Sequence, residues 1–256
     1  MLPNYATPAA PGEVLIRNTQ EKTISKQEHM TFRSGVGILL YLVKHSRPEL
    51  ANAVRELTKV MDNPNKEHFK SLYRTIKYVL DTKDYGICLS TNKNIGENLI
   101  LAAYSDSTYG GDSDKCLSIT GWIILIEGMI LSWKSRAQRS VSLSSTESEY
   151  VASSETCAEL MAVLQVMEFL GIKIKYPITI YVDNTGAIYL ANNSTVGGRT
   201  RHVNIRYHYV RQYIEDGIVK IEFIKSQDNI ADAWTKNLSQ ELFHKHTSKY
   251  VKPCPK

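Results

Sequence analysis

The stretch Leu99-Ile-Leu-Ala-Ala-Tyr-Ser-Asp106 decides the fold class, because it is an apolar run of strand length that ends in a carboxylate. A second run of the same form, Pro177 to Val182, is followed directly by Asp183. In an α/β sheet, ligands bind at the rim formed by the carboxyl ends of neighbouring strands. We therefore expect Asp106 and Asp183, each at the end of its strand, to lie together at a ligand-binding edge.

The elements around these two runs predict an α/β fold with a mixed sheet flanked by helices. The β-rich stretches 118–126 and 129–133 are separated by Glu127-Gly128, a two-residue hairpin turn. A long helix begins at 144–146 and ends at Gly171, where glycine suits a helix end. The remaining elements are a short helix to Asn192, a helix over 204–215, a strand over 218–224 and a short helix from Asp228. This alternation is typical of layered α/β domains.

Residues 31–95 instead have the apolar spacing of helices. Val36, Leu39, Leu40 and Val43 recur at the spacing of one apolar helix face. Two further helices are expected over 48–61 and 67–80, and a short strand over 84–89. We therefore expect a proline-containing extended arm (1–30), a small helical module (31–95), an α/β domain (96–240) and a C-terminal tail (241–256).

The composition is that of an ordinary globular protein. The 256 residues include 31 Lys and Arg against 26 Asp and Glu, and 43% are hydrophobic, which excludes a disordered chain. No apolar run approaches the ~20 residues of a membrane helix, and the N-terminal residues do not resemble a signal peptide. No membrane partner is therefore expected. The four scattered cysteines (Cys88, Cys116, Cys157, Cys254) show no metal-ligand spacing and predict reduced thiols of an intracellular protein.

Four carboxylates fall at element ends in one compatible order. Besides Asp106 and Asp183, these are Glu149 in the first turn of the long helix and Asp232 on the last short helix. Glu149 shares a mostly apolar stripe with Ala152 and Leu160, which points it toward the sheet, whereas Glu147 shares a face with polar residues. Four converging carboxylates are hard oxygen ligands that suit Mg²⁺ or Mn²⁺ and not zinc. Paired divalent ions stabilise the attacking and leaving oxygens of phosphoryl transfer, so this set favours a nuclease.

Each acid also has a purely structural interpretation, which the sequence leaves open. Asp106 could belong to an ordinary turn, and Glu149 could close a capping box that begins at Thr146. Asp183 could cap the short helix that follows it. Asp232 could lie on the surface.

Two basic clusters predict a polyanionic partner. One precedes the long helix and contains Lys134, Arg136 and Arg139; the other, free of acids, contains Arg199, Arg201, His202, Arg206 and His208. Such clusters neutralise phosphates and make binding fall steeply with salt. The alternative interpretation is two solvated loops.

A series of short motifs runs in one order along residues 99–237: Ala103-Tyr-Ser-Asp106, Ile119-Thr-Gly-Trp122, Leu131–Ser135, Leu143–Ala152, Val182-Asp-Asn184, Arg199–His202, Asn204–His208 and Ala231-Asp-Ala-Trp-Thr-Lys236. Through these motifs the chain resembles the ribonuclease H domain of Ty1/copia-type retrotransposon polyproteins. Residues 31–90 are similar to the connection segment between polymerase and nuclease, through Arg33–Tyr41, Arg47-Pro48, Met61–Pro64 and Asp84–Gly86.

The resemblance implies an endonuclease that hydrolyses the RNA strand of RNA·DNA hybrids, with two Mg²⁺ ions held by Asp106, Glu149, Asp183 and Asp232. Glu149 is favoured because the family's glutamate directly precedes an apolar-x-Ala sequence, here Tyr150-Val-Ala, and Glu147 remains an alternative. A hybrid is recognised by groove shape and 2′-hydroxyls, so little sequence preference is expected. A reverse transcriptase polymerase domain, or a second copy of the chain, is the expected protein partner.

The chain departs from the family pattern in one loop. Cellular enzymes of this fold often carry a histidine before the last aspartate, where this chain has Lys225-Ser-Gln-Asp228. Proton transfer or product release would then rely on water, on Lys225, or on His202 or His208.

Other functions stay open on the sequence alone. The run Tyr181-Val-Asp-Asn184 resembles a polymerase turn but lacks its second aspartate, so the chain is not expected to polymerise by itself. A non-catalytic nucleic-acid-binding remnant of a retroelement is one alternative. An integrase-like or resolvase-like nuclease is another.

Overall fold

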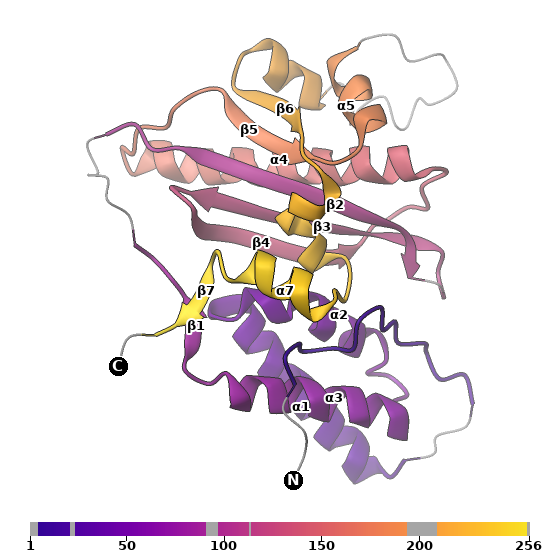
Figure 1. The fold of residues 1–256 in the computed structure, drawn as a ribbon. Helices are drawn as coiled ribbons and strands as arrows, with labels where there is room; N and C mark the ends of the chain where they lie inside the picture. The colour runs from indigo at the N-terminus through magenta and orange to yellow at the C-terminus, as the bar shows by residue number, and fades with distance from the viewer. Residues whose placement is uncertain (1–4, 21–23, 91–96, 113, 194–208, 255–256) are drawn as a thin grey trace. The chain divides into compact units, whose positions relative to one another are not determined.

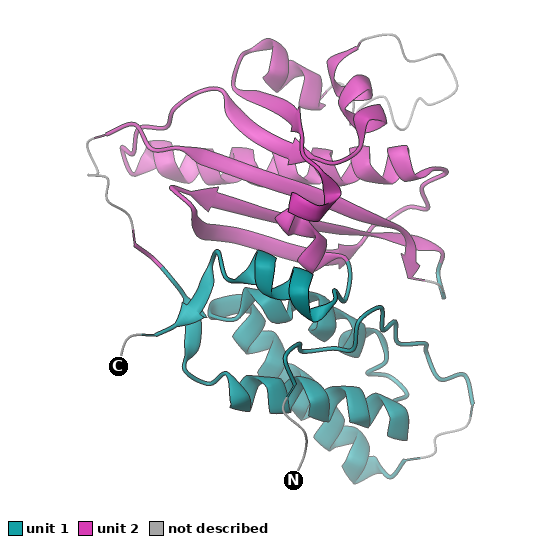
Figure 2. Ribbon diagram, in the orientation of Figure 1, with its two compact units in different colours: residues 1–88, 113–115, 236–256 teal, residues 89–112, 116–235 magenta. Residues whose placement is uncertain are grey.

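The computed structural model describes residues 5–20, 24–90, 97–112, 114–193 and 209–254. The chain divides into two compact units, coloured separately in Figure 2. Unit 1 comprises residues 1–88, 113–115 and 236–256, and unit 2 comprises residues 89–112 and 116–235.

Unit 2 is built on one five-stranded sheet with the order β4-β3-β2-β5-β6 (Figure 1). The strands are β2 (Leu101–Asp112), β3 (Leu117–Ile126), β4 (Met129–Ala137), β5 (Ile178–Val182) and β6 (Val219–Phe223). The first three form an antiparallel meander, whereas β5 is parallel to β2 and β6 is parallel to β5. The mixed sheet expected from the sequence is confirmed.

The long helix α4 (Ser145–Phe169) covers one face of this sheet (Figure 1). Its buried side chains, among them Leu160 and Leu164, share a core with Ile124 of β3 and Ile180 of β5. The other described helical parts of unit 2 are α5 (Thr185–Asn192), residues 209–215, and the 3₁₀ turns η2 (Ser226–Asp228) and η3 (Ile230–Trp234).

Gly121 of β3 lets η3 lie directly against the sheet. A Cβ atom on Gly121 would come within 2.8 Å of the Trp234 Cβ, closer than such atoms approach in proteins. The absence of a side chain at this position therefore brings the segment that carries Asp232 next to the central strands.

The expectation that Asp106 ends its strand is wrong. β2 continues to Asp112 because its antiparallel pairing with β3 runs on past Asp106, which lies opposite Gly121. The parallel pairing with β5, however, stops at Tyr104. Asp106 thus lies just beyond the last residue of β2 that pairs with β5.

Unit 1 contains the three helices expected from the sequence. They are α1 (Lys26–His45), α2 (Ala51–Lys59), which follows the 3₁₀ turn η1 (Pro48–Leu50), and α3 (Lys66–Asp81). α1 begins before residue 31 because Ser25 and Glu28 form a capping box at its start. Buried apolar side chains of all three helices, such as Phe32, Leu57 and Leu72, form the core of this unit.

Residues 241–256, expected as a tail, contribute regular structure to unit 1. They include most of α7 (Gln240–Thr247) and all of β7 (Val251–Pro253). β7 pairs antiparallel with β1 (Tyr85–Ile87), which joins two segments far apart in the sequence.

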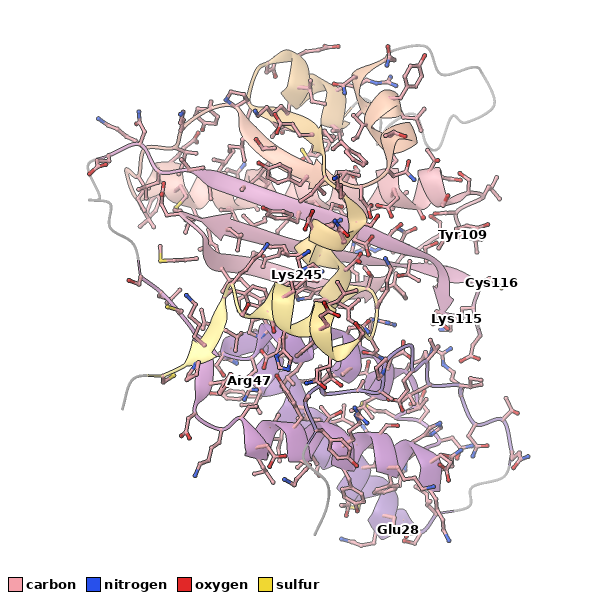
Figure 3. All side chains as sticks on the ribbon, viewed as in Figure 1. Glu28, Arg47, Tyr109, Lys115, Cys116 and Lys245 are labelled. Carbon is pink, nitrogen blue, oxygen red and sulfur yellow. The ribbon has the colours of Figure 1, made fainter. Side chains whose placement is uncertain are left out.

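Among the residues that the structure describes, no helix is both long and apolar enough to span a bilayer. All four cysteines are free thiols: Cys116, labelled in Figure 3, and Cys254 are exposed, and Cys157 is buried.

Candidate active site

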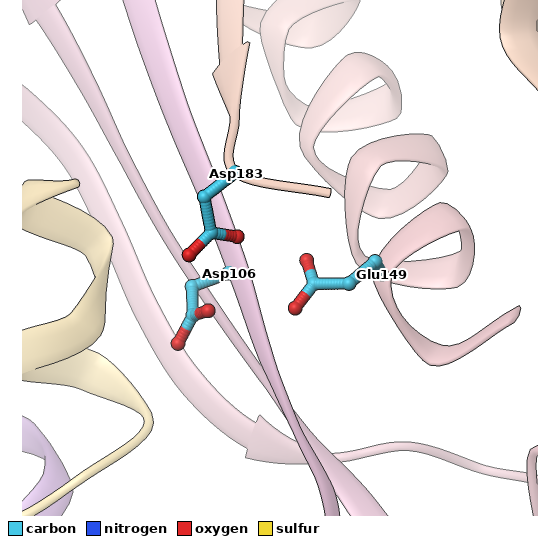
Figure 4. Close-up of side chains that lie close together, drawn as sticks. All are labelled: Asp106, Glu149 and Asp183. Atoms are coloured by element: carbon cyan, nitrogen blue, oxygen red, sulfur yellow. The ribbon is translucent and has the colours of Figure 1, made fainter. Parts of the chain in front are cut away.

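Three carboxylates of unit 2 converge beside the central strand β2, where the neighbouring strand β5 ends. They belong to Asp106 in β2, Glu149 in the first turns of α4, and Asp183 directly after β5. One oxygen from each lies within 4.8 Å of the other two, and Figure 4 shows all three groups facing one another. The structure thus brings together three of the four acids singled out from the sequence.

The structure distinguishes Glu149 from Glu147. The N-cap of α4 is Ser144, whose hydroxyl accepts the Glu147 N–H, and the Glu147 Oε2 accepts the Leu143 N–H at 2.7 Å. Glu147 therefore closes the start of the helix. Glu149, one half-turn further on, is 6% exposed and faces Asp106 and Asp183.

The Glu149 carboxylate is buried with little compensation. Its Oε1 accepts the Ser107 N–H at 3.1 Å, and the Ser107 hydroxyl bonds to that of Ser148 at 2.8 Å. No group in the described residues donates a hydrogen bond to Oε2, which is buried. Burial, together with the negative charges of Asp106 and Asp183, raises the pKa of Glu149 to about 9.

The structural interpretations of the two aspartates do not hold. Asp106 is 1% exposed inside a strand, not in a turn, and its Oδ2 accepts a hydrogen bond from the Thr235 hydroxyl. The N-cap of α5 is Asn184, whose Oδ1 accepts the Ala187 N–H at 2.9 Å. Asp183 is therefore not needed as the helix cap, and its half-buried carboxylate faces the other two acids.

Asp232 is not part of this three-carboxylate group. It lies on η3, 7% exposed, and is therefore not a surface residue. Its segment is fixed beside the site, because the Asn229 Nδ2 donates to the Ser105 carbonyl at 2.9 Å.

The predicted basic residues differ in exposure and in their partners. Lys134 and Arg139 are exposed. Arg136 forms an ion pair with Glu155 of α4 at 2.6 Å, and its guanidinium lies 5.8 Å from the Trp122 ring centroid. The second cluster, Arg199, Arg201, His202, Arg206 and His208, lies outside the described residues.

Three residues at the site were not singled out from the sequence. Ser107 donates its N–H to Glu149, Thr235 bonds to Asp106, and Asn229 anchors η3. Asn229 carries a readable signal, because asparagine just before a short helix is a common N-cap. The contacts of Ser107 and Thr235 depend on tertiary structure and have no local signal.

The donor set fits a divalent cation. All three groups offer carboxylate oxygen, the ligand preferred by hard cations such as Mg²⁺ and Mn²⁺. Three ionised carboxylates this close would repel one another, and a buried oxygen without a donor loses its hydration without compensation. A bound cation would remove both penalties.

Comparison with known proteins places the chain in a family. It is 35% identical over 244 residues to the retrovirus-related Pol polyprotein from transposon RE2 of Arabidopsis thaliana, covering 95% of the chain. It is 32% identical over 241 residues to the corresponding polyprotein from transposon TNT 1-94 of Nicotiana tabacum, covering 93% of the chain. The chain belongs to the Ty1/copia-type Pol polyproteins.

This Ty1/copia-type chain spans only a small part of those relatives, 16% of the length of the first and 18% of the second. No known family model matches it. A solved structure with a similar fold is the N-terminal ribonuclease H domain of Rv2228c from Mycobacterium tuberculosis. It has 8% sequence identity and a TM-score of 0.41, and the likeness covers 59% of this chain and 98% of that one. Unit 2 itself has the mixed five-stranded sheet with flanking helices that the sequence predicted.

Proposed function

We propose that this Ty1/copia-type chain is a ribonuclease H that uses divalent metal ions, Mg²⁺ in the cell, to hydrolyse the RNA strand of RNA·DNA hybrids. The observation that carries the proposal is the convergence of Asp106, Glu149 and Asp183 from two strands and a helix. Membership of the family supports it, because these acids occupy the positions that the family resemblance gives to metal ligands.

In the proposed mechanism, Asp106, Glu149 and Asp183 hold the metal, and Asp232 serves as a fourth ligand. When bound, a pair of divalent ions lowers the pKa of a water and stabilises the departing 3′ oxygen. The protein fixes the ligands: Ser107 orients Glu149 through its N–H, and β2 and the end of β5 carry the two aspartates. Lys225, which precedes η2, is a candidate for assisting product release.

The substrate is a polyanion, so cations around the acids are expected to hold its phosphates. We assign this role to the exposed Lys134 and Arg139, and also to the predicted residues between 199 and 208. Arg136 contributes mainly by fixing β4 to α4, since its guanidinium is paired with Glu155. Binding should therefore weaken as salt increases. We propose no polymerase activity for this chain by itself.

The test uses purified protein, an end-labelled RNA·DNA hybrid, and duplex DNA and duplex RNA of the same sequence. Cleavage of the hybrid RNA in Mg²⁺, its loss in EDTA, and little cleavage of either duplex are the expected results. Asp183→Asn should abolish cleavage and preserve hybrid binding. A folded wild-type protein that leaves the hybrid intact at micromolar concentration would contradict the proposal.

Two other outcomes would identify the alternative functions. Hybrid binding that is unaffected by divalent ions, without turnover, would indicate a non-catalytic nucleic-acid-binding remnant. Preferential cleavage of duplex DNA would indicate an integrase-like or resolvase-like nuclease.

A further inference from the structure

One side chain contacts the site from a segment that carries none of the three converging acids. Thr235, directly after η3, is 4% exposed, and its hydroxyl donates to the Asp106 Oδ2. The same hydroxyl oxygen lies 3.3 Å from the carbonyl oxygen of Asp232. Thr235 thus lies between the carboxylate of one acid and the main chain of another.

The segment that carries Thr235 is fixed to β2 at both of its ends. At its start, Asn229 donates from Nδ2 to the Ser105 carbonyl at 2.9 Å and accepts the Ala231 N–H at 3.1 Å. At its end, the Thr108 hydroxyl donates to the Thr235 carbonyl at 3.4 Å. These bonds involve Ser105 and Thr108, which flank Asp106 on the same strand.

The methyl group of Thr235 is also confined. A Cβ on Gly121 would lie 2.7 Å from the Thr235 Cγ2, so the methyl group sits against the bare backbone of β3. A threonine held on both sides in this way has little freedom at χ1, and its hydroxyl direction is set before any ligand arrives.

We propose that Thr235 is a positioning residue for the metal site: its hydroxyl fixes the rotation of the Asp106 carboxylate and links it to the segment of Asp232. This inference rests on the proposed function of the site. A carboxylate with one oxygen held by a hydrogen bond presents its other oxygen in a defined direction. Partners that orient metal ligands typically contribute about 10- to 100-fold in metal affinity or activity.

The experiment compares three variants of the full chain. Thr235→Val keeps the shape and removes the hydroxyl, whereas Thr235→Ser keeps the hydroxyl and removes the confined methyl group. Thr156→Val is the matched control, since Thr156 is a fully buried threonine of α4 that bonds to the Ala152 carbonyl at 2.8 Å, outside the acid group. The primary measurement is the midpoint of Mn²⁺ binding, fitted from the dependence of Tm on the Mn²⁺ concentration. The Mg²⁺ concentration for half-maximal hybrid cleavage is the second measurement.

Thr235→Val should raise both metal concentrations by about 10- to 100-fold. Thr235→Ser and Thr156→Val should leave them near the wild-type values. If the valine variant does not fold, Thr235→Ala is compared with Thr235→Ser. These two side chains differ by the hydroxyl group alone, so the pair also isolates its contribution to metal binding.

A wild-type metal midpoint in Thr235→Val or Thr235→Ala would overturn the inference and leave the proposed function intact. A loss of Tm shared with Thr156→Val, with an unchanged metal midpoint, would also overturn it, because that result describes a structural threonine. A wild-type protein with neither metal stabilisation nor cleavage would overturn the proposed function and this inference together.

Discussion

Two buried glutamates, one in each unit, differ in the groups that surround their carboxylates. Glu56 of α2 is 3% exposed and is surrounded by its own partners: Lys59 at 3.0 Å, Arg55 at 2.8 Å and the Leu15 N–H at 2.7 Å. Glu149 is 6% exposed and has one backbone N–H and two further acids beside it.

The difference separates a buried carboxylate with compensating partners from one without them. A buried charge is tolerated when it is paired and hydrogen-bonded, as Glu56 is. Glu149 lacks such a pair in the described residues, and the raised pKa of its carboxyl reflects that deficit. We expect a cation from solution to bind among these three carboxylates and to supply the missing positive charge.

The largest effect is expected for Glu149→Gln. The substitution keeps the size of the side chain and removes a metal ligand, so cleavage of the RNA·DNA hybrid should fall by roughly a thousandfold or more, corresponding to several kcal/mol of charge stabilisation. The metal-free fold should remain, as judged by circular dichroism and Tm. Retention of substantial cleavage would remove Glu149 from the site.

Glu56→Gln should produce the opposite pattern. Losing one partner of a buried ion pair leaves Lys59 without its counter-charge, so the free energy of unfolding should drop by about 3 kcal/mol, measured by urea denaturation. The Mn²⁺ midpoint should stay at the wild-type value. A change in metal affinity without a change in stability would refute the assignment of Glu56 as purely structural.

The pH dependence of the metal-free protein should carry the signature of Glu149. The pKa of this carboxyl is about 9 in the folded chain against 4.5 as the ordinary value, so between these pH values the folded state retains a proton that the unfolded state has lost. The contribution of this carboxyl to the free energy of unfolding is therefore fully present below pH 4.5. It is lost as the pH rises toward 9, by up to about 1.4 kcal/mol per pH unit.

Glu149→Gln is the matched control for that pH experiment, because glutamine does not titrate. The free energy of unfolding, measured from pH 5 to pH 9 with EDTA present, should fall less steeply with pH in the variant than in the wild-type protein. Identical slopes in the two proteins would show that Glu149 keeps an ordinary pKa.

The smallest effect is expected for Glu147→Gln. Its carboxylate accepts the Leu143 N–H at the start of α4, so its replacement should cost about 0.5–1 kcal/mol of stability. Cleavage and metal affinity should stay at wild-type values. A large loss of cleavage in this variant, with Glu149→Gln still active, would exchange the roles of the two glutamates.

The comparison also shows what the sequence could predict. The position of Asp183 followed from the end of its strand, and that of Glu149 from the apolar stripe of α4, and tertiary structure preserved both local signals. Asp106 lies at the site although its strand does not end there. The capping box of Ser25 and Glu28 was equally readable, and it would have given the true start of α1.

Other features had no local signal. The continuation of β2 beyond Asp106 contains Ser107, Thr108 and two glycines, a composition typical of a turn. Pairing with β3 continues through Thr108 and resumes at Asp112 after an irregularity at the glycines. The β1–β7 pair joins two three-residue strands far apart in the chain. The bond from Thr235 to Asp106 likewise spans most of unit 2, so it could be found only in the folded chain.

The most direct test of the central claim is anomalous diffraction from crystals of the protein grown in Mn²⁺. The account predicts a manganese peak within coordination distance of carboxylate oxygens from Asp106, Glu149 and Asp183, and its absence from crystals of Glu149→Gln. A peak bound elsewhere, or an empty acid group at millimolar Mn²⁺, would contradict it.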